Sequence, residues 1–193
     1  MKRLASLALL AVLTLSACGS SATPNYYTLN ATAAPGSPPL PAAIVLVAPV
    51  TVPAAVDQPQ MVTEAGGNRV QIEEFNRWAE PLNDNIAQVV AENLSVLLGT
   101  PSVATAPLPN LTPGYLVSIQ VQQFESMPGQ AAALEAFWTV SDVAARITRS
   151  GRTRVSEPVQ DDSLAALAAA HSRALAQLSQ EIATALRAEA AST

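Results

Sequence analysis

Cys18 is the residue with the most definite chemistry in this sequence, and it is the chain's single cysteine. A thiolate is a soft nucleophile. The residues just before it, 15–17, are one aliphatic and two small ones, which let a peptidase reach the backbone. A positively charged start at residues 1–3 and an apolar stretch over 4–15 complete the parts of a secretory signal peptide. We therefore predict that residues 1–17 are removed and that Cys18 begins the mature chain.

The sequence around Cys18 resembles the bacterial lipobox, which implies that the thiol accepts a diacylglyceryl group and the new N-terminus an acyl chain. A transmembrane anchor is the weaker alternative, because a membrane-spanning helix needs about 20 apolar residues. One acyl chain binds a membrane only marginally, so the several chains of a processed lipoprotein are expected to hold the protein there. In enterobacterial lipoproteins an aspartate after the lipidated cysteine favours retention in the inner membrane. The residue here is Gly19, so the resemblance favours the periplasmic face of the outer membrane.

Catalysis finds little support in the other residues. His171 is the single histidine, and it lies on the apolar stripe of the predicted last helix, where burial with one hydrogen bond is the simpler interpretation. A Ser-His-Asp site would need a distant serine and carboxylate to meet it, and no Gly-x-Ser-x-Gly turn is present. One imidazole and an acylated thiol are too few ligands for zinc. We expect no enzymatic activity, no metal and no cofactor other than the lipid on Cys18.

The mature chain is acidic and free of lysine. Removal of residues 1–17 takes Lys2 and Arg3 from the ten basic residues and leaves all fifteen acidic ones, so the formal net charge moves from −5 to about −7. Such a chain is a poor partner for nucleic acid. Four arginines crowd one predicted hairpin, as a solvated face or as a contact for an acidic partner or lipid phosphates. They are Arg146, Arg149, Arg152 and Arg154.

Residues 18–25 are predicted to be the lipidated N-terminus and tether, and residues 26–190 a single α+β domain. A proline-rich segment, 31–41, is expected to form an extended loop. Tyr26 and Tyr27 begin a β-prone stretch, as an ordinary edge strand or as anchors at the level of lipid headgroups. Strands are predicted at residues 26–29, 44–52, 61–64, 69–73, 115–122, 134–140 and 153–159.

Turn residues separate several of these strands. Glycine and asparagine in 65–68 predict the tight turn of a β-hairpin, and Ser150 with Gly151 predicts a turn before the strand at 153–159. Pro49 lies inside the apolar run 44–52, which indicates that this strand ends there or follows a sheet edge.

Two helices follow from the apolar periodicity. One has Pro81 in its first turn and stops at Gly99, and the other is capped by residues 161–163 and continues through 164–186. The order strands, helix, strands, helix favours an antiparallel or mixed sheet with two main helices packed on one face, a two-layer α+β fold.

Two short segments combine residues that are typical of contacts between proteins. Arg77 and Trp78 precede the first helix together with Glu80 and Pro81, and tryptophan and arginine are enriched among interface hot spots. The favoured interpretation is structural, with Trp78 in the core and Arg77 paired with Glu80 or a neighbour; the alternative is an exposed docking anchor. Asp57 and Pro59 belong to a segment that is predicted to form the turn before the hairpin. The alternative is that this segment lines a surface that faces a partner.

Several segments of the chain resemble, in the same order, the auxiliary lipoproteins of ABC-type transport systems, specifically the paraquat-inducible-operon lipoprotein family. They are Tyr-Tyr-Thr-Leu at 26–29, Val-Pro-Ala-Ala-Val-Asp-Gln-Pro-Gln-Met-Val at 52–62, Arg-Trp-Ala-Glu-Pro-Leu at 77–82, Ala-Glu-Asn-Leu at 91–94 and the alanine-rich final helix. The segment at 77–82 is the most specific, and residues 54–56 are blander than the aromatic-containing version expected there.

This resemblance implies a noncatalytic adaptor at the outer membrane that serves an intermembrane lipid transport system. Family members accompany proteins with mammalian-cell-entry (MCE) domains, which build hydrophobic tunnels across the periplasm, and the lipoprotein would dock on the far end of the tunnel. Rings occur in the family, so a homo-oligomer is a further expectation. The alternatives are a structural lipoprotein of another outer-membrane assembly or secretion complex, and a periplasmic lipid-binding protein.

Overall fold

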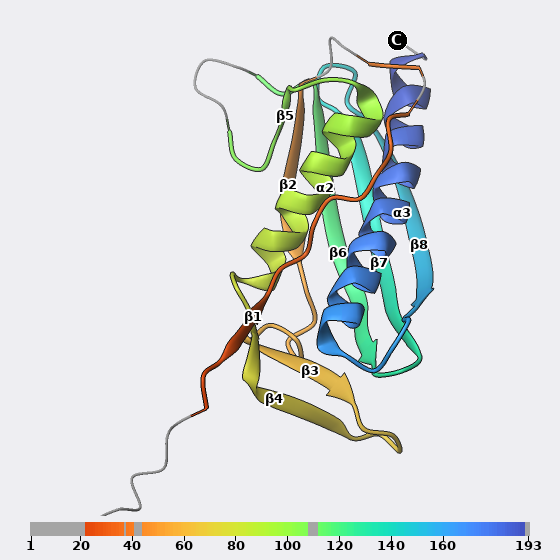
Figure 1. Ribbon diagram of the computed structural model, residues 1–193. Coiled ribbons are helices and arrows are strands. Elements are labelled where there is room, and N and C mark those ends of the chain that lie inside the picture. Colours follow the sequence, from red (N-terminus) through yellow and green to blue (C-terminus); the bar gives the residue numbers. More distant parts are fainter. Residues whose placement is uncertain (1–21, 37, 41–43, 108–111, 192–193) are drawn as a thin grey trace, which may run out of the picture.

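The computed structural model describes residues 22–36, 38–40, 44–107 and 112–191, and this part of the chain forms two helices and two open sheets (Figure 1). The helices are α2 (Leu82–Leu98) and α3 (Leu164–Ala190). The strands are β1 (Asn25–Tyr27), β2 (Val45–Thr51), β3 (Gln60–Glu64), β4 (Val70–Trp78), β5 (Val103–Ala104), β6 (Tyr115–Met127), β7 (Ala131–Asp142) and β8 (Ile147–Pro158). The predicted α+β class is confirmed.

The larger sheet has the strand order β5-β2-β6-β7-β8 and is mixed. Strand β2 runs parallel to both of its neighbours, whereas β6, β7 and β8 form an antiparallel meander. Both helices lie across one face of this sheet, α2 against β2 and α3 against β7 and β8 (Figure 1). Among the described residues no helix covers the other face, which agrees with the predicted two-layer arrangement.

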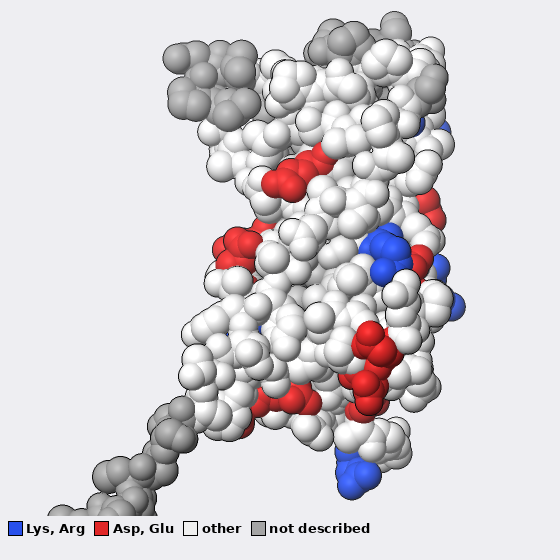
Figure 2. Space-filling model, viewed as in Figure 1, with Lys and Arg blue, Asp and Glu red and all other residues white. Residues whose placement is uncertain are grey.

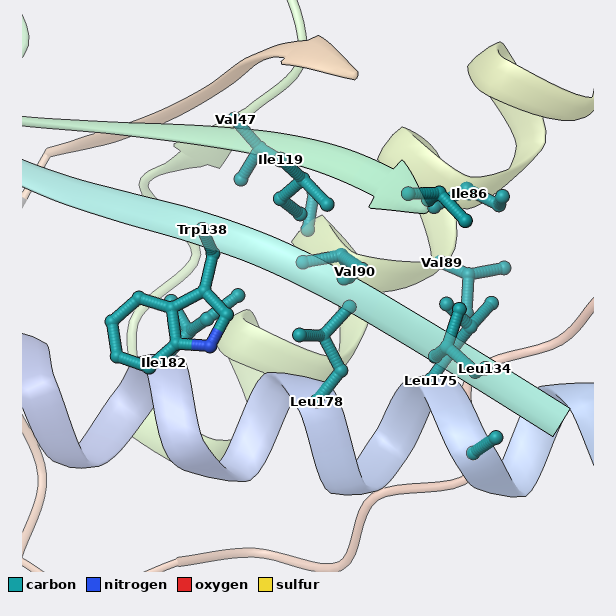
Figure 3. Packing of buried hydrophobic residues seen from close by; sticks show 14 of the residues in the cluster. Val47, Ile86, Val89, Val90, Ile119, Leu134, Trp138, Leu175, Leu178 and Ile182 are labelled. Atoms are coloured by element: carbon teal, nitrogen blue, oxygen red, sulfur yellow. The ribbon is translucent and has the colours of Figure 1, made fainter. Parts of the chain in front are cut away.

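The hydrophobic core fills the space between the larger sheet and the two helices. Alternate side chains of a strand point to one face, so Ile119 of β6 and Trp138 of β7 point toward the helical layer. Leu175, Leu178 and Ile182 of α3 meet them from the other side, as Figure 3 shows. All five side chains are almost fully buried. The steps of three and four along α3 are therefore a core-facing stripe.

Helix α2 ends where Gly99 predicts and begins at Leu82, just after Pro81, which was expected inside the first turn. Pro81 occupies the N-cap position, and its carbonyl accepts from the amides of Asp84 and Asn85. Gly99 follows the last turn with a φ of 62°, the left-handed conformation that glycine adopts at little cost. At the start of α3, Ser163 caps the helix by accepting a 3.1 Å hydrogen bond from the amide of Ala166.

The smaller sheet has the order β1-β4-β3 and lies at one end of the molecule (Figure 1). Strands β3 and β4 form the predicted hairpin, with positive φ angles at Gly66, Gly67 and Asn68 in its turn. Strand β1 runs parallel to β4 along its other edge. Met61 and Trp78 from this sheet are buried in the common core.

The turn predicted at Ser150 and Gly151 is wrong. Both residues lie inside β8, and the chain reverses over 143–146, where Arg146 has a φ of 58°. Gly151 pairs directly with Trp138, and a Cβ atom at Gly151 would overlap the indole ring. The glycine therefore serves close side-chain packing within the sheet, not a reversal of the chain.

Two further strand details differ from the expectation. Strand β2 does not end at Pro49 but continues to Thr51. Its neighbour β5 pairs only with Val45 and Leu46, so on that side Pro49 lies at an unpaired edge of the described sheet. Strand β6 extends to Met127, five residues past its predicted end. A register shift between Val121 and Gln123 interrupts its alternation there.

The segment after β1 crosses the two helices in an extended path (Figure 1). We call residues 28–40 the strap. Side chains of α2 hold it: Asn85 accepts from the amide of Leu29 at 2.8 Å, and Asn93 accepts from the amides of residues 32 and 33. Ser172 of α3 accepts from the amide of Asn30 at 3.1 Å. The proline-rich loop predicted at 31–41 is therefore a docked element as far as it is described.

The signal segment 1–17, Cys18 and the first part of the tether lie outside the described residues. Within the described ranges, neither helix is long and apolar enough to cross a membrane.

Candidate partner-docking site

Five of the six residues predicted for partner docking line one surface hollow of about 310 Å³. Its walls come from residues 57–59, before β3, and from residues 78–82, where β4 passes into α2. The segments are some twenty residues apart in the sequence, and a 2.8 Å hydrogen bond from the amide of Trp78 to the carbonyl of Pro59 joins them. Arg77 does not line this hollow.

The wall at 57–59 is shaped by a compact turn. The amides of Val56 and Asp57 both donate to the carbonyl of Pro53, at 3.0 and 3.2 Å. The side chain of Gln58 donates to the carbonyl of Ala55 at 3.1 Å. Val56 is buried by this turn, and Asp57 is left exposed at the rim.

Trp78 and Leu82 form the apolar floor. Trp78 is 6% exposed, and its ring meets Phe124 edge-on at 6.1 Å between centroids. Trp78 therefore lies in the core, as the structural interpretation expects, and it also borders the hollow; its role as a docking anchor stays a prediction. Arg77 donates to the carbonyl of Glu74, a neighbour on its own strand, and Glu80 accepts from Asn85.

The rim of the hollow is acidic. Asp57 and Glu80 are both exposed, and a 2.8 Å hydrogen bond from the Asn85 side-chain amide orients the Glu80 carboxylate. A second hollow of about 490 Å³ adjoins the first along α2, shares Glu80 and adds Asp84. Figure 2 shows acidic groups along this flank of α2. Neither hollow is lined by an arginine, so the surface suits an apolar side chain flanked by positive charge.

Asn85 and Asn93 are buried polar residues beside the candidate site that the sequence did not single out. Each is buried on the apolar stripe of α2, and Asn85 connects the strap to the Glu80 rim through its two polar atoms. The sequence does show that these two asparagines, eight residues apart, lie on the same face of the predicted helix as its leucines and valines. Buried polar side chains need partners, which here are backbone amides of the strap.

His171 is buried, as predicted. It is 0% exposed, stacks on Phe124 at 3.7 Å between ring centroids, and shares a 2.9 Å hydrogen bond with Ser126. Burial lowers the pKa of His171 to about 3, so the ring is neutral at physiological pH. No hydrogen-bond partner of its Nδ1 atom is found in the described part of the chain. The Ser126–His171 pair therefore lacks both solvent access and an orienting carboxylate.

The arginine-rich hairpin is largely engaged within the protein. Arg152 and Arg154 both pair with Glu135 on the sheet face without helices, and their hydrogen bonds hold the pKa of Glu135 below its usual value. Arg149 points to the other face and pairs with Glu189 of α3. These pairs favour the solvated-face interpretation, and the contact with an acidic partner stays a prediction. In the described ranges no cluster of three or more His, Cys, Asp or Glu residues is placed to hold a metal.

Residues 27–183 match the family described as the ABC-type transport auxiliary lipoprotein component. The chain belongs to this family. The match runs from the last residue of β1 through most of α3 and so contains the strap, the larger sheet, the β3–β4 hairpin and the hollow. It confirms the resemblance inferred from the segments at 26–29, 52–62 and 77–82.

Two solved structures share the fold of this auxiliary lipoprotein. The crystal structure of a Xanthomonas campestris protein of the DUF330 family has a TM-score of 0.67 at 24% identity, covering 82% of this chain and 92% of that one. A second crystal structure, of an uncharacterized protein, has a TM-score of 0.66 at 23% identity and covers 86% and 99%. A comparison with curated protein sequences gives no match.

Proposed function

We propose that this auxiliary lipoprotein is a noncatalytic adaptor, anchored by Cys18 at the periplasmic face of the outer membrane, in an MCE-type ABC system for intermembrane lipid transport. The membership in the ABC auxiliary family supports the transport role. The lipobox-like residues before Cys18 and the Gly19 that follows support the address. In this mechanism the acyl chains fix one end of the transport path, and the folded domain positions the exit of the MCE-domain tunnel protein.

One observation carries the docking part of the proposal. Two of the segments that carry the family resemblance, 52–62 and 77–82, meet in space and supply the walls of one hollow with an acidic rim and an apolar floor. The polar contacts that shape it are internal, but its rim carboxylates at Asp57 and Glu80 are exposed. A partner that places an apolar side chain over Trp78 and a positive charge near the rim would satisfy both features. Assembly into a homo-oligomer is part of the same proposal.

The test is binding of the acylated protein to the MCE-domain protein of its own system. Asp57→Arg is expected to weaken binding by about tenfold or more through charge repulsion at the rim. Asp162→Arg is the matched control, because it makes the same change at an exposed aspartate before α3 and is expected to bind normally. Equal binding by the two variants would remove the hollow from the interface.

Two further outcomes address the adaptor role itself. Co-purification with a β-barrel or secretin in place of an MCE-domain protein would favour the alternative of another outer-membrane complex. Cys18→Ser is expected to abolish incorporation of labelled palmitate and to release the protein from the membrane. A mature protein with a bare Cys18 would contradict the proposed address.

A further inference from the structure

We infer that the three-stranded sheet is a membrane-contacting face, whose exposed apolar side chains rest in the headgroup region of the bilayer that holds the lipid on Cys18. The inference rests on the proposed lipid anchor, but it adds an orientation that the anchor alone does not give. The contacting side chains are Tyr26 of β1 and Val70, Ile72 and Phe75 of β4.

The exposed large apolar side chains of the described chain are concentrated in this sheet. Tyr26 is 63% exposed, Val70 is 57%, and Ile72 and Phe75 are 50% each. The remaining three are Val96 on α2, Phe137 on β7 and Val143 after β7, which belong to separate elements. Scattered apolar residues need no explanation, but several on one small sheet mark a contact surface.

The pairing register shows that part of this set shares one face. Val62 pairs with Ile72 and Glu64 pairs with Val70 in the antiparallel hairpin, and paired residues point to the same side. Met61, on the alternate side of β3, is buried in the common core. Val70 and Ile72 therefore lie on the side of the hairpin opposite Met61; Val62, on the same side, packs against the core, so the exposed apolar part of this face is Val70 and Ile72.

The length of the tether brings this sheet to the membrane. Only six residues separate Cys18 from Asn25, the first residue of β1. Even a fully extended tether spans no more than about 25 Å from Cys18 to Asn25. Tyr26 is the next residue, and the hairpin of β3 and β4 lies at the same end of the molecule (Figure 1). Val143 directly follows β7, a strand of 12 residues that runs along the larger sheet toward the opposite end of the molecule (Figure 1).

The charges around the face fit a zwitterionic bilayer better than a strongly anionic one. Arg77 lies in β4 and Arg69 is exposed in the turn before it, but Glu64, Glu73 and Glu74 offset these two charges. Contact is therefore driven by apolar side chains, with tyrosine placed where interfacial aromatic residues are commonly found. A phosphatidylethanolamine surface meets these requirements.

The test places tryptophan reporters in the full acylated protein and reconstitutes it in phosphatidylethanolamine vesicles with brominated acyl chains, which quench nearby indoles. The two native tryptophans, Trp78 and Trp138, are 6% and 8% exposed and supply a constant background. Phe75→Trp and Tyr26→Trp are expected to be quenched at least about twofold more than Val143→Trp, the exposed control at the far end of β7. The use of two reporters covers the failure of either variant to fold.

Each result bears on one idea only. A mass for Cys18 without lipid contradicts the anchor and hence the proposed function. An acylated protein in which both reporters remain unquenched, or are quenched no more than Val143→Trp, overturns the membrane face and leaves the adaptor proposal standing. Unquenched reporters that cross-link to another copy of the chain would show that a second protomer covers the sheet, which also overturns the inference.

Discussion

The two sheets of this protein are built from strands of the same alternating kind, yet they differ in what covers them. The larger sheet lies under α2 and α3, and the apolar side chains on that face are buried. The smaller sheet contributes Met61 and Trp78 to the same core but leaves Val70, Ile72 and Phe75 half exposed or more. The alternation of apolar and polar residues in a strand therefore indicates which residues share a face. The elements packed against that face decide whether it is buried from solvent.

Substitution of two isoleucines, one packed under the larger sheet and one on the smaller sheet, should give the largest difference in unfolding free energy. Ile182 on α3 is 0% exposed under the larger sheet, and Ile72 on the smaller sheet is 50% exposed. Ile182→Ala is expected to lower the free energy of unfolding by about 2–5 kcal/mol, because it leaves a cavity. Ile72→Ala should change it by no more than about 0.5 kcal/mol. Urea unfolding measures both, and equal losses would show that the smaller sheet's face is covered in the folded protein.

Asn85 connects the end of β1 to the helical layer, and its removal should have the next largest effect. Asn85→Ala leaves the buried amide of Leu29 without its acceptor and should cost about 1–3 kcal/mol of unfolding free energy. Asn83→Ala, at a less buried asparagine of the same turn, is the control and should change the unfolding free energy by less than about 0.5 kcal/mol. Hydrogen exchange at Leu29 reports the contact directly, and unchanged protection there would contradict the role.

Acid should destabilise the covered core through His171. Its pKa falls from 6.5 to about 3 on folding, so below pH 6.5 the unfolded chain binds a proton that the folded one does not. Stability is therefore lost as the pH falls, by about 1 kcal/mol between pH 6 and pH 5. His171→Gln should remove this part of the slope in pH-dependent urea unfolding. An unchanged slope in that variant would assign the acid sensitivity to other groups.

The uncovered face of the larger sheet should be the least sensitive of all. The Arg154 side chain is 70% exposed where it pairs with Glu135. Arg154→Ala is expected to lower the Tm by less than about 3 °C, since exposed ion pairs contribute little. Raising the salt concentration should shrink the difference further. A larger fall in the Tm would show that the Arg154–Glu135 pair contributes more to stability than an exposed ion pair does.

Residues that act locally made much of the fold predictable. Pro81 and Gly99 delimit α2, Ser163 caps α3, and the turn at 65–68 forms because glycine and asparagine tolerate positive φ. These effects need only neighbours in the chain. The apolar stripe of α3 was equally clear because it repeats over many turns.

The parts that escaped prediction depend on contacts between distant segments. Strand β1 pairs in parallel with β4, which lies some fifty residues later in the sequence. Gly151 is required by the indole ring of Trp138 on the neighbouring strand. The shift in β6 after Val121 breaks the alternation that would have revealed Phe124. Within the candidate site, Trp78 and Asp57 were found from their residue types. Asn85 was not, because only the folded strap gives it a partner.

The strap has a consequence for the order in which the protein matures. Asn30 and Ser172 are 142 residues apart, and the hydrogen bond from Arg187 to the carbonyl of Pro38 closes a span of 149. A chain made from its N-terminus onward therefore cannot seat this segment until almost all of α3 is present. Such long-range closure is slow compared with local helix formation. Under the proposed anchoring, Cys18 would therefore meet the acylating and cutting enzymes before the domain closes.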